Sequence, residues 1–462
     1  MGLVLLPTPA IATCKADLGP ALEAIAAAPA LQSARLGMLV ETEGGEEIYS
    51  RDADHFFVPA SNVKLFTTAA ALDVLGPDYR IRTSIYGQPT AADQPLVVVG
   101  RGDPSLGLPQ LQQLSAQIQP QVGRVSRLLG DDSYFPGSPY NANWEWEDVQ
   151  AGYGAPVNSL ILNGNAVDIT LTPRQPGQPL GVSWVNPPLA PPWPIENHSR
   201  TVAPGSHSGA QIDLLWQPSL RVRGQLAADS PPKTWSLAIP TPGDYFLQQL
   251  AAQLEQIGVA VGPIAVTTTP IPIRQPLAQL AAVESPPLDQ LLVIANQDSD
   301  NLYAEALLKT LGKHLHPQAL DATAAGLDAI ATTLARLGVS PDSFELVDGS
   351  GIARQNLATP RALVSTLQAM DHHPYRQAYQ DSLAVAGVSG TLRNRLRGAP
   401  AVNLRGKSGA LTGNVSLSGY LSPPHYEPLI VSILINHSDR HANHLRQLID
   451  QMLVEIAQLR QC

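Results

Sequence analysis

The sequence Val58-Pro59-Ala60-Ser61-Asn62-Val63-Lys64-Leu65-Phe66 has the form of a loop that ends where a helix begins. Pro59 and Ser61 are typical of a first helical turn, and an apolar, alanine-rich run continues to Leu75. Residues three positions apart share one face of a helix, so the Ser61 hydroxyl and the Lys64 amine can meet there. A desolvated lysine can take the proton of a serine hydroxyl and make it a nucleophile. The stretch therefore predicts a nucleophilic serine and its base at a helix start.

The same spacing of serine and lysine occurs a second time, in a context that prevents this chemistry. Ser230 and Lys233 are separated by two prolines, which are incompatible with an ordinary helical turn, so this copy is interpreted as a loop. The spacing thus has meaning only with its context. For Ser61 and Lys64 taken alone, an ordinary helix start is about as good an explanation as catalysis.

Length and composition limit the classes of protein to consider. A chain of 462 residues favours two or three domains and is long enough for a substantial core. The net charge of −10 and the isoelectric point near 5.5 argue against a polyanionic partner such as nucleic acid. The 42 prolines and 36 glycines favour many turns over a bundle of long helices.

The two cysteines and the N-terminal segment give information about the cellular compartment of the protein. Cys14 and Cys462 could form a disulfide in an oxidising compartment, could be two unrelated thiols, or Cys14 could carry a lipid. Residues 1–13 resemble the end of a secretory signal that lacks its basic region. No later stretch reaches the roughly 18 consecutive apolar residues of a membrane span. We therefore expect an exported protein, soluble or attached to a surface.

Alanine-rich helical patterns occur toward both ends of the chain but not in the middle. Between residues 86 and 275 the sequence has short, strand-like runs separated by turns and prolines. Beyond residue 287 we expect helices at 288–296 and 302–311, and antiparallel strands at 400–405, 413–421 and 428–436. The sequence predicts an α+β protein whose catalytic domain is split by a long, mainly-β insertion.

Two further strings carry candidate chemistry. Ser299-Asp300-Asn301 lies between two expected helices, where Ser299 could relay a proton and Asn301 could bind a substrate amide. The alternative is that Ser299 only caps the second helix. Gly406-Lys407-Ser408-Gly409-Ala410 lies on an expected strand, where Lys407 could attract a carboxylate and glycine permits close approach by a ligand. The alternative is a lysine on a solvated strand face.

A metal site and a glycosidase site are both disfavoured. His437, His441 and His444 have helical spacing near the start of the last helix, which we expect Ser438 to cap. No accompanying glutamate pattern of a zinc enzyme is present, so a solvated face explains these histidines better. No pair of aspartates or glutamates has the pattern of paired catalytic carboxylates.

The three strings around Ser61, Ser299 and Lys407 are together typical of penicillin-binding proteins and class A β-lactamases. Four other short strings match a single family, namely Gly100-Arg101-Gly102-Asp103-Pro104, Tyr153-Gly154-Ala155-Pro156-Val157, Asp348-Gly349-Ser350-Gly351 and Gly390-Thr391-Leu392. On these residues the chain resembles the low-molecular-mass class C penicillin-binding proteins, the exported D-alanyl-D-alanine carboxypeptidases and endopeptidases of bacterial cell walls. The resemblance spans nearly the whole chain. Ser408 stands where threonine is usual and keeps the hydroxyl.

The resemblance implies a penicillin-binding/β-lactamase-like catalytic domain, an antiparallel sheet flanked by helices, at residues 16–85 and 276–462. It also implies two smaller inserted domains in the long interval between Ser61 and Ser299. Domain II would comprise residues 86–170 and 240–275, and domain III residues 171–239.

The resemblance also implies a role for each candidate residue. Ser61 would attack the carbonyl between two D-alanines to form an acyl-enzyme, with Lys64 as its base. Ser299 would pass the proton to the departing amine, assisted by Lys407, and Asn301 would bind the peptide amide. Lys407 and Ser408 would hold the terminal carboxylate beside Gly409. Backbone N–H groups of Ser61 and Ala410 would form the oxyanion hole.

The implied partners are peptidoglycan peptides as substrates and β-lactam antibiotics as inhibitors that acylate Ser61. No metal or organic cofactor is needed, and neither a nucleic-acid partner nor a membrane span is expected. One alternative is a β-lactamase or esterase that uses the same serine; the long insertion and the absence of a recognisable deacylating glutamate motif argue against it. Another is a non-catalytic wall-binding protein with this fold.

Overall fold

The computed structural model describes residues 13–88, 93–215, 219–274, 276–398 and 402–462. The segment that resembles a secretory signal lies outside these residues, apart from Thr13. The chain divides into two compact units. Unit 1 comprises residues 13–78, 288–311 and 326–462, and unit 2 comprises residues 79–287 and 312–325.

Unit 1 is built on a six-stranded sheet with the order β20-β21-β22-β23-β2-β3, in which every neighbouring pair is antiparallel. The strands are β2 (Arg35–Thr42), β3 (Glu47–Arg51), β20 (Ala384–Val385), β21 (Asn403–Leu411), β22 (Asn414–Ser422) and β23 (Leu429–Asn436). All eight residues of β23 are buried, because helices cover both faces of the sheet. The expected antiparallel sheet flanked by helices is therefore present.

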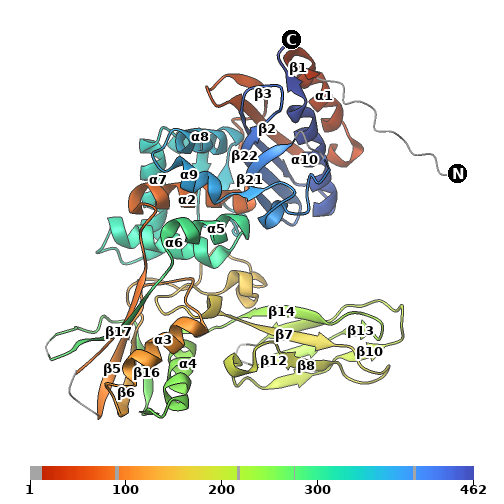
Figure 1. The fold of residues 1–462 in the computed structure, drawn as a ribbon. Helices are drawn as coiled ribbons and strands as arrows, with labels where there is room; N and C mark the ends of the chain where they lie inside the picture. Colours follow the sequence, from red (N-terminus) through yellow and green to blue (C-terminus); the bar gives the residue numbers. More distant parts are fainter. Residues whose placement is uncertain (1–12, 89–92, 216–218, 275, 399–401) are drawn as a thin grey trace. The chain divides into compact units, whose positions relative to one another are not determined.

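Helices α1 (Lys15–Ala26) and α10 (Ala442–Ala457) share one core with the sheet, to which Leu22, Ile433 and Ile449 contribute. Helix α8 (Pro360–Asp371) contacts β2, β22 and β23, and it also contacts α2 (Val63–Leu75), which packs against α5 (Leu288–Gln297). Figure 1 shows α1 and α10 on one side of the sheet and α2, α5, α8 and α9 (Arg376–Asp381) on the other. Helices α6 (Asn301–Leu315) and α7 (Ala322–Arg336) lie mostly in unit 1, and the residues 312–325 at their facing ends belong to unit 2.

The two cysteines form a disulfide. Cys14 lies in β1 (Thr13–Cys14), which pairs in parallel with β24 (Leu459–Arg460), and this pairing brings the Cα atoms of Cys14 and Cys462 to 5.7 Å. The sequence left open a disulfide, two unrelated thiols or a lipid on Cys14, and the structure has the disulfide. The sulfur of Cys14 is therefore not available to carry a lipid.

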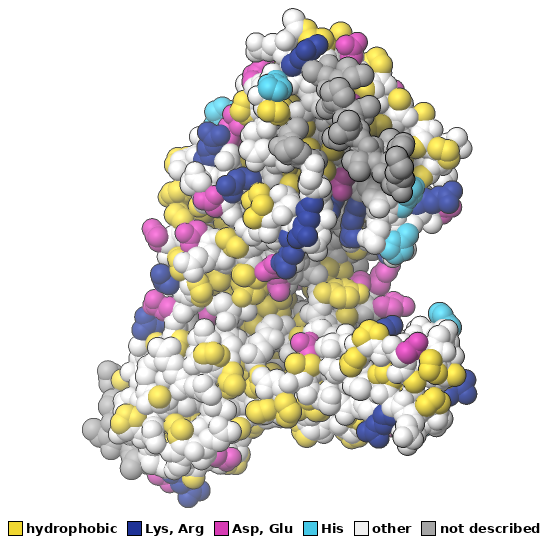
Figure 2. Space-filling model, turned by 45° about the vertical axis from the view of Figure 1, so that its right-hand side comes forward, with side chains coloured by type: hydrophobic (Ala, Val, Ile, Leu, Met, Phe, Trp, Pro, Cys, Tyr) yellow, Lys and Arg dark blue, Asp and Glu magenta, His cyan; other side chains and the backbone are white. Residues whose placement is uncertain are grey.

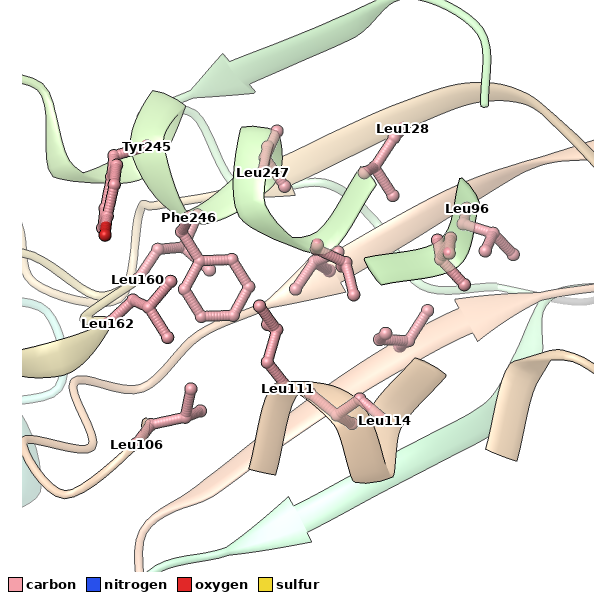
Figure 3. Packing of buried hydrophobic residues seen from close by; sticks show 14 of the residues in the cluster. Leu96, Leu106, Leu111, Leu114, Leu128, Leu160, Leu162, Tyr245, Phe246 and Leu247 are labelled. Carbon is pink, nitrogen blue, oxygen red and sulfur yellow. The ribbon is translucent and has the colours of Figure 1, made fainter. Parts of the chain in front are cut away.

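Unit 2 contains the insertion. Its main sheet has the order β15-β6-β5-β4-β17, with β16 also paired to β6. These strands are β4 (Arg82–Gly87), β5 (Asp93–Val99), β6 (Arg124–Asp131), β15 (Ala260–Val261), β16 (Ile264–Thr267) and β17 (Ala278–Glu284). Helices α3 (Leu108–Ile118) and α4 (Pro242–Gln256) pack on it, and Figure 3 shows Leu111 and Phe246 from these helices facing each other in the core.

The rest of unit 2 consists of small sheets. One is β14-β7-β8, with β7 (Ala166–Thr172), β8 (Gly181–Trp184) and β14 (Lys233–Ala238). Another is β11-β12-β9, with β9 (Ile195–Asn197), β11 (Gln211–Leu214) and β12 (Leu220–Arg223), and a third pairs β10 (Arg200–Val202) with β13 (Gln225–Ala227). Leu171, Leu180, Val222 and Leu226 form a separate small core here. We propose that this core belongs to the domain expected at residues 171–239; the exact domain boundaries stay a prediction.

The described part of the chain has no helix that is both long enough and apolar enough to cross a membrane. On the face drawn in Figure 2, acidic and basic side chains are interspersed rather than separated into regions of one sign.

The disulfide makes a prediction about stability. Replacing Cys462 by serine (Cys462→Ser) removes a link between positions 448 apart, and such links typically contribute about 2–4 kcal/mol by restricting the unfolded chain. We expect the midpoint of thermal unfolding to fall by roughly 2–8 °C, measured by circular dichroism. A reducing agent should lower the midpoint of the wild type to that of the variant and leave the variant unchanged. Equal midpoints for the oxidised wild type and the variant would contradict the prediction.

Candidate active site

Ser61 lies in a short 3₁₀ turn, Ala60–Asn62, which leads directly into α2. The expected helix start is present, but the serine precedes the α-helix proper by two residues. Lys64 lies in the first turn of α2, and its Nζ donates a hydrogen bond to Ser61 Oγ at 3.2 Å. Ala60 has a φ of 49°, in the left-handed region that a residue with a side chain rarely adopts. The turn that carries Ser61 is therefore held in an unusual backbone conformation.

The Lys64 side chain is fully buried and meets three oxygen acceptors. Besides Ser61 Oγ, its Nζ donates to Asn301 Oδ1 at 2.6 Å and to the backbone carbonyl of Ser350 at 2.7 Å. An ammonium group has three N–H donors, so these contacts satisfy it completely. The amine is thus fixed in position beside the hydroxyl.

Burial also changes the acidity of this amine. Removal from water lowers the pKa of Lys64 to about 8, although the nearby carboxylates of Asp348, Asp300 and Glu305 act to raise it. A lysine with such a pKa is neutral for a useful fraction of the time near physiological pH. Lys64 can therefore accept the proton of Ser61, which an ordinary surface lysine cannot.

Ser299 and Asn301 lie at the corner between α5 and α6, as expected. Ser299 has a φ of 62°, and Asp300 Oδ1 accepts a hydrogen bond from the backbone N–H of Tyr303 at 3.0 Å. Asp300 thus caps α6, so the alternative that Ser299 only caps this helix does not describe the corner. Asn301 begins α6 and is directed to Lys64.

Lys407 lies on β21 and is fully buried, so the alternative of a lysine on a solvated strand face is wrong. Its Nζ donates to Ser299 Oγ at 2.9 Å and to the carbonyl of Ser408 at 2.8 Å. Burial and the nearby Lys64 lower the pKa of Lys407 well below its usual range. The second buried amine therefore contacts the second serine, just as Lys64 contacts Ser61.

The edge of β21 forms one wall of the site. β20 pairs with β21 only at Arg405 and Gly406, so within the described residues no strand pairs with this edge along 407–411. A Cβ on Gly409 would lie 2.8 Å from the carbonyl oxygen of Pro59 and 2.9 Å from the Ser61 nitrogen. Only glycine lets the strand approach the nucleophile turn this closely. An open strand edge beside the serine can pair with an extended peptide.

A cleft of about 800 Å³ joins these groups. Its lining includes Ser61 and Ser299 as well as the three expected substrate-binding residues, Ser408, Gly409 and Ala410. Ser408 Oγ donates to the hydroxyl of Thr391 at 2.8 Å. The structure thus brings every site residue that the sequence indicated to one cleft or directly behind its wall.

Several contributors to the site were not assigned a role from the sequence. The carbonyl of Ser350 and the carboxylate of Asp348 belong to the string 348–351, which by itself indicates only a resemblance to a family. Glu305 is buried and accepts a hydrogen bond from the Gly349 N–H at 2.8 Å, although its spacing to Lys309 is that of an ordinary helical ion pair. Burial and the adjacent Asp348 raise the pKa of Glu305.

His437 and His441 precede the last helix, and His444 lies in its first turn. No group of three or more metal-ligating side chains comes together among the residues that the structure describes. The expectation that Ser438 caps this helix is wrong, because α10 begins at Ala442 and His441 caps it by accepting from the Asn443 N–H at 3.3 Å.

Comparison with known families decides the identity. Residues 18–456 match the model of the D-Ala-D-Ala carboxypeptidase 3 (S13) family. The chain belongs to this family. It is 34% identical to a D-alanyl-D-alanine carboxypeptidase of Actinomadura sp. (strain R39), over 91% of this chain and 81% of that protein. It is 26% identical to the D-alanyl-D-alanine carboxypeptidase DacB of Haemophilus influenzae, over 82% of this chain and 81% of that protein.

The fold has a solved counterpart. The crystal structure of penicillin binding protein 4 (dacB) from Haemophilus influenzae superposes with a TM-score of 0.84 at 22% identity, covering 94% of this chain and 98% of that one. The resemblance to class C penicillin-binding proteins and the predicted α+β, penicillin-binding-protein-like fold are therefore confirmed. Members of the family are serine carboxypeptidases, which is the enzyme class that the sequence indicated.

The pKa of Lys64 makes a prediction about pH. If neutral Lys64 is the base, the fraction of active enzyme is small below pH 7, rises through pH 8 and is nearly complete above pH 9. We expect the rate of acylation by a fluorescent penicillin to rise about tenfold per pH unit in the acidic range and then to level off. Adduct formation between pH 5.5 and 9.5 measures this, in the wild type and in Lys64→Arg, which should show no such rise because arginine stays charged. A flat profile for the wild type would exclude Lys64 as the titrating base.

Two glycines allow a matched test of the nucleophile turn. Gly351 and Gly338 have φ values of +85° and +89°, so a Cβ is strained at either position. A Cβ on Gly351 would also overlap the carbonyl of Ala60, whereas none of the surrounding atoms lies within 4 Å of a Cβ on Gly338. We expect Gly351→Ala to slow acylation by about 10²-fold, because it displaces Ser61. Gly338→Ala should lower stability by roughly 1–2 kcal/mol but leave the acylation rate unchanged. Equal acylation rates for the two variants would refute the role assigned to Gly351.

Proposed function

We propose that this chain is a serine-type D-Ala-D-Ala carboxypeptidase that cleaves peptidoglycan stem peptides through an acyl-enzyme on Ser61. One observation carries the proposal: the buried Lys64 amine, with its pKa lowered to about 8, contacts the Ser61 hydroxyl at 3.2 Å. Ser61 attacks the carbonyl carbon of the bond between the two D-alanines. Its proton passes to neutral Lys64, which becomes the ammonium form that its three acceptors stabilise.

Lys407 and Ser299 deliver a proton to the leaving amine. Lys407 Nζ donates to Ser299 Oγ, so the Ser299 proton is directed away from Lys407 and can pass to the leaving nitrogen. The Lys64 ammonium then resupplies the proton, and the peptide bond breaks when the leaving D-alanine departs as an amine. This relay requires Ser299 to face the cleft, which it does.

Asn301, Ser408 and the strand edge position the peptide. Asn301, whose Oδ1 accepts from Lys64, binds the amide of the substrate peptide. The hydroxyl of Ser408 and the Lys407 amine hold the terminal carboxylate. The edge of β21 from Lys407 onward pairs with the extended peptide, and Gly409 permits its close approach.

The oxyanion hole consists of the backbone N–H groups of Ser61 and Ala410. The close packing of Gly409 on the Ser61 turn supports this assignment, since it brings the backbones of β21 and of the nucleophile turn together. Each such donor contributes about 3 kcal/mol to stabilising the tetrahedral intermediate in enzymes where it has been measured. Water then hydrolyses the acyl-enzyme, whereas a β-lactam leaves a long-lived adduct on the same serine.

The enzyme works outside the cytoplasm, in the periplasm or an equivalent extracytoplasmic space. The disulfide between Cys14 and Cys462 supports this proposal, because such bonds persist in oxidising compartments. Its partners are the peptides of the cell wall, and β-lactam antibiotics are its inhibitors. A crystal structure of the similar Haemophilus influenzae protein in complex with a β-lactam is consistent with this inhibition.

The experiment that tests the function uses the two serine–lysine copies of this chain. We expect purified wild type to form a stable adduct with a fluorescent penicillin and to release a terminal alanine from a peptide ending in D-Ala-D-Ala, read by mass. Ser61→Ala should form no adduct and lose at least about 10³-fold in kcat. Ser230→Ala, which changes the second copy of the spacing, should behave as wild type.

The other outcomes favour the alternatives. Rapid turnover of penicillin without a stable adduct would indicate a β-lactamase, and neither adduct nor cleavage would indicate a wall-binding protein. Digestion of cross-linked peptide dimers, also read by mass, separates endopeptidase from carboxypeptidase activity.

A further inference from the structure

The catalytic cleft continues beyond the residues that the mechanism uses. Past Ser408 and Thr391 its wall is formed by the segment after the 3₁₀ turn Gly390–Leu392 and by one face of α10. The charged residues of this wall are Arg395, Arg397, Arg446 and Asp450, and its polar residues include Asn443. All of them belong to unit 1, together with the catalytic residues.

This wall has more basic than acidic side chains, namely three arginines and one aspartate among the described lining residues. Arg395 and Asp450 form an ion pair with N···O distances of 2.6, 3.2 and 3.3 Å, so the one carboxylate among the described lining residues is already occupied. Arg446 donates to the neutral Asn443 Oδ1 at 2.9 Å, and Arg397 donates to the carbonyl of Arg393 at 2.8 Å. Neither arginine forms an ion pair with a described residue. Two guanidinium groups therefore face the cleft without a carboxylate partner among the described residues.

Arg446 is the better placed of the two for binding. It is half-buried, and its position one helical turn before Asp450 puts it beside the Arg395 guanidinium. Burial and the charge of Arg395 lower the pKa of Arg446, and the nearby Asp450 carboxylate offsets this only in part, so the charged form of Arg446 is disfavoured where it stands. An anion in the cleft would remove this penalty. The planar donors of arginine suit a carboxylate, which can accept two parallel hydrogen bonds.

We propose that Arg446 and Arg397 form a second carboxylate subsite on the leaving-group side of the scissile bond. The side follows from the proposed function, on which this inference rests: Ser408 holds the carboxylate of the leaving residue, and the arginine wall begins next to Ser408 and Thr391. The ligand is a leaving group larger than alanine that carries an additional carboxylate, as an acidic residue or a branched acidic peptide does. Such leaving groups are cleaved in preference to neutral ones of equal size.

The test compares three peptides that share one acyl part ending in D-Ala and differ only in the leaving residue: D-Ala, D-Gln or D-Glu. D-Gln and D-Glu have nearly the same size and differ in charge. For the wild type at low ionic strength we expect kcat/KM to be about tenfold higher for D-Glu than for D-Gln, and we expect this preference to shrink as salt is added. In Arg446→Gln and in Arg397→Gln the ratio should fall toward one. Cleavage of the D-Ala peptide should stay within about twofold of wild type in both variants.

The control is Arg440→Gln, because Arg440 is an exposed arginine that pairs with Asp439 and does not line the cleft. This variant should keep the wild-type ratio, and penicillin adduct formation verifies that all variants are folded. The proposal is overturned if the wild type does not prefer D-Glu to D-Gln, or if both arginine variants keep the preference. Failure of the proposed function would look different, because then the wild type would not cleave the D-Ala peptide either.

Discussion

The active site depends on the burial of one amine, Lys64, against three oxygen acceptors. An unpaired charge in such a position would cost several kcal/mol, so the surroundings must hold the acceptors in place. Asp348 does so for the carbonyl of Ser350: its carboxylate accepts from the N–H groups of Ser350, Gly351 and Ala353 at 3.2, 2.7 and 2.8 Å. The same carboxylate raises the pKa of Lys64 against the effect of burial. One acidic side chain therefore fixes the loop and tunes the base.

The second amine makes the arrangement a coupled one. Burial, together with the nearby Lys64, lowers the pKa of Lys407, and each amine contacts a different serine hydroxyl. In the proposed mechanism Lys64 takes a proton from Ser61, and this adds positive charge close to Lys407, so the protonation states of the two amines are coupled. The short segment Ser299–Asn301 connects the two pairs, since its ends contact Lys407 and Lys64 respectively. A single rigid corner between α5 and α6 can therefore serve both halves of the reaction.

The residues proposed to carry the chemistry could be predicted from the sequence because each stands in a short string on a recognisable element: a helix start, a helix–helix corner and a strand. The sequence could not predict those contacts in the site that do not depend on the type of residue or on a distinctive spacing. The acceptor at Ser350 is a backbone carbonyl, which any residue possesses. The spacing of Glu305 and Lys309 is the same whether the pair is exposed or buried. Pairing of Cys14 with Cys462 depends on the parallel pairing of β1 with β24. Each of these strands has only two residues, which is too short to be predicted from a sequence pattern.

Backbone strain at the nucleophile shows why segments so distant in the chain must assemble together. The φ of 49° at Ala60 destabilises the fold by about 1–2 kcal/mol relative to an ordinary backbone conformation. Such a conformation persists only where contacts with the surrounding structure enforce it. Two glycines provide that confinement: Gly351 packs against Ala60, and Gly409 packs against Pro59 and the Ser61 nitrogen. Ser416 Oγ adds a hydrogen bond to the carbonyl of Pro59 at 2.6 Å. The turn is therefore held between the Asp348 loop and the β21–β22 pair, so the orientation of the Ser61 hydroxyl is a property of the assembled catalytic unit and not of the helix that follows it.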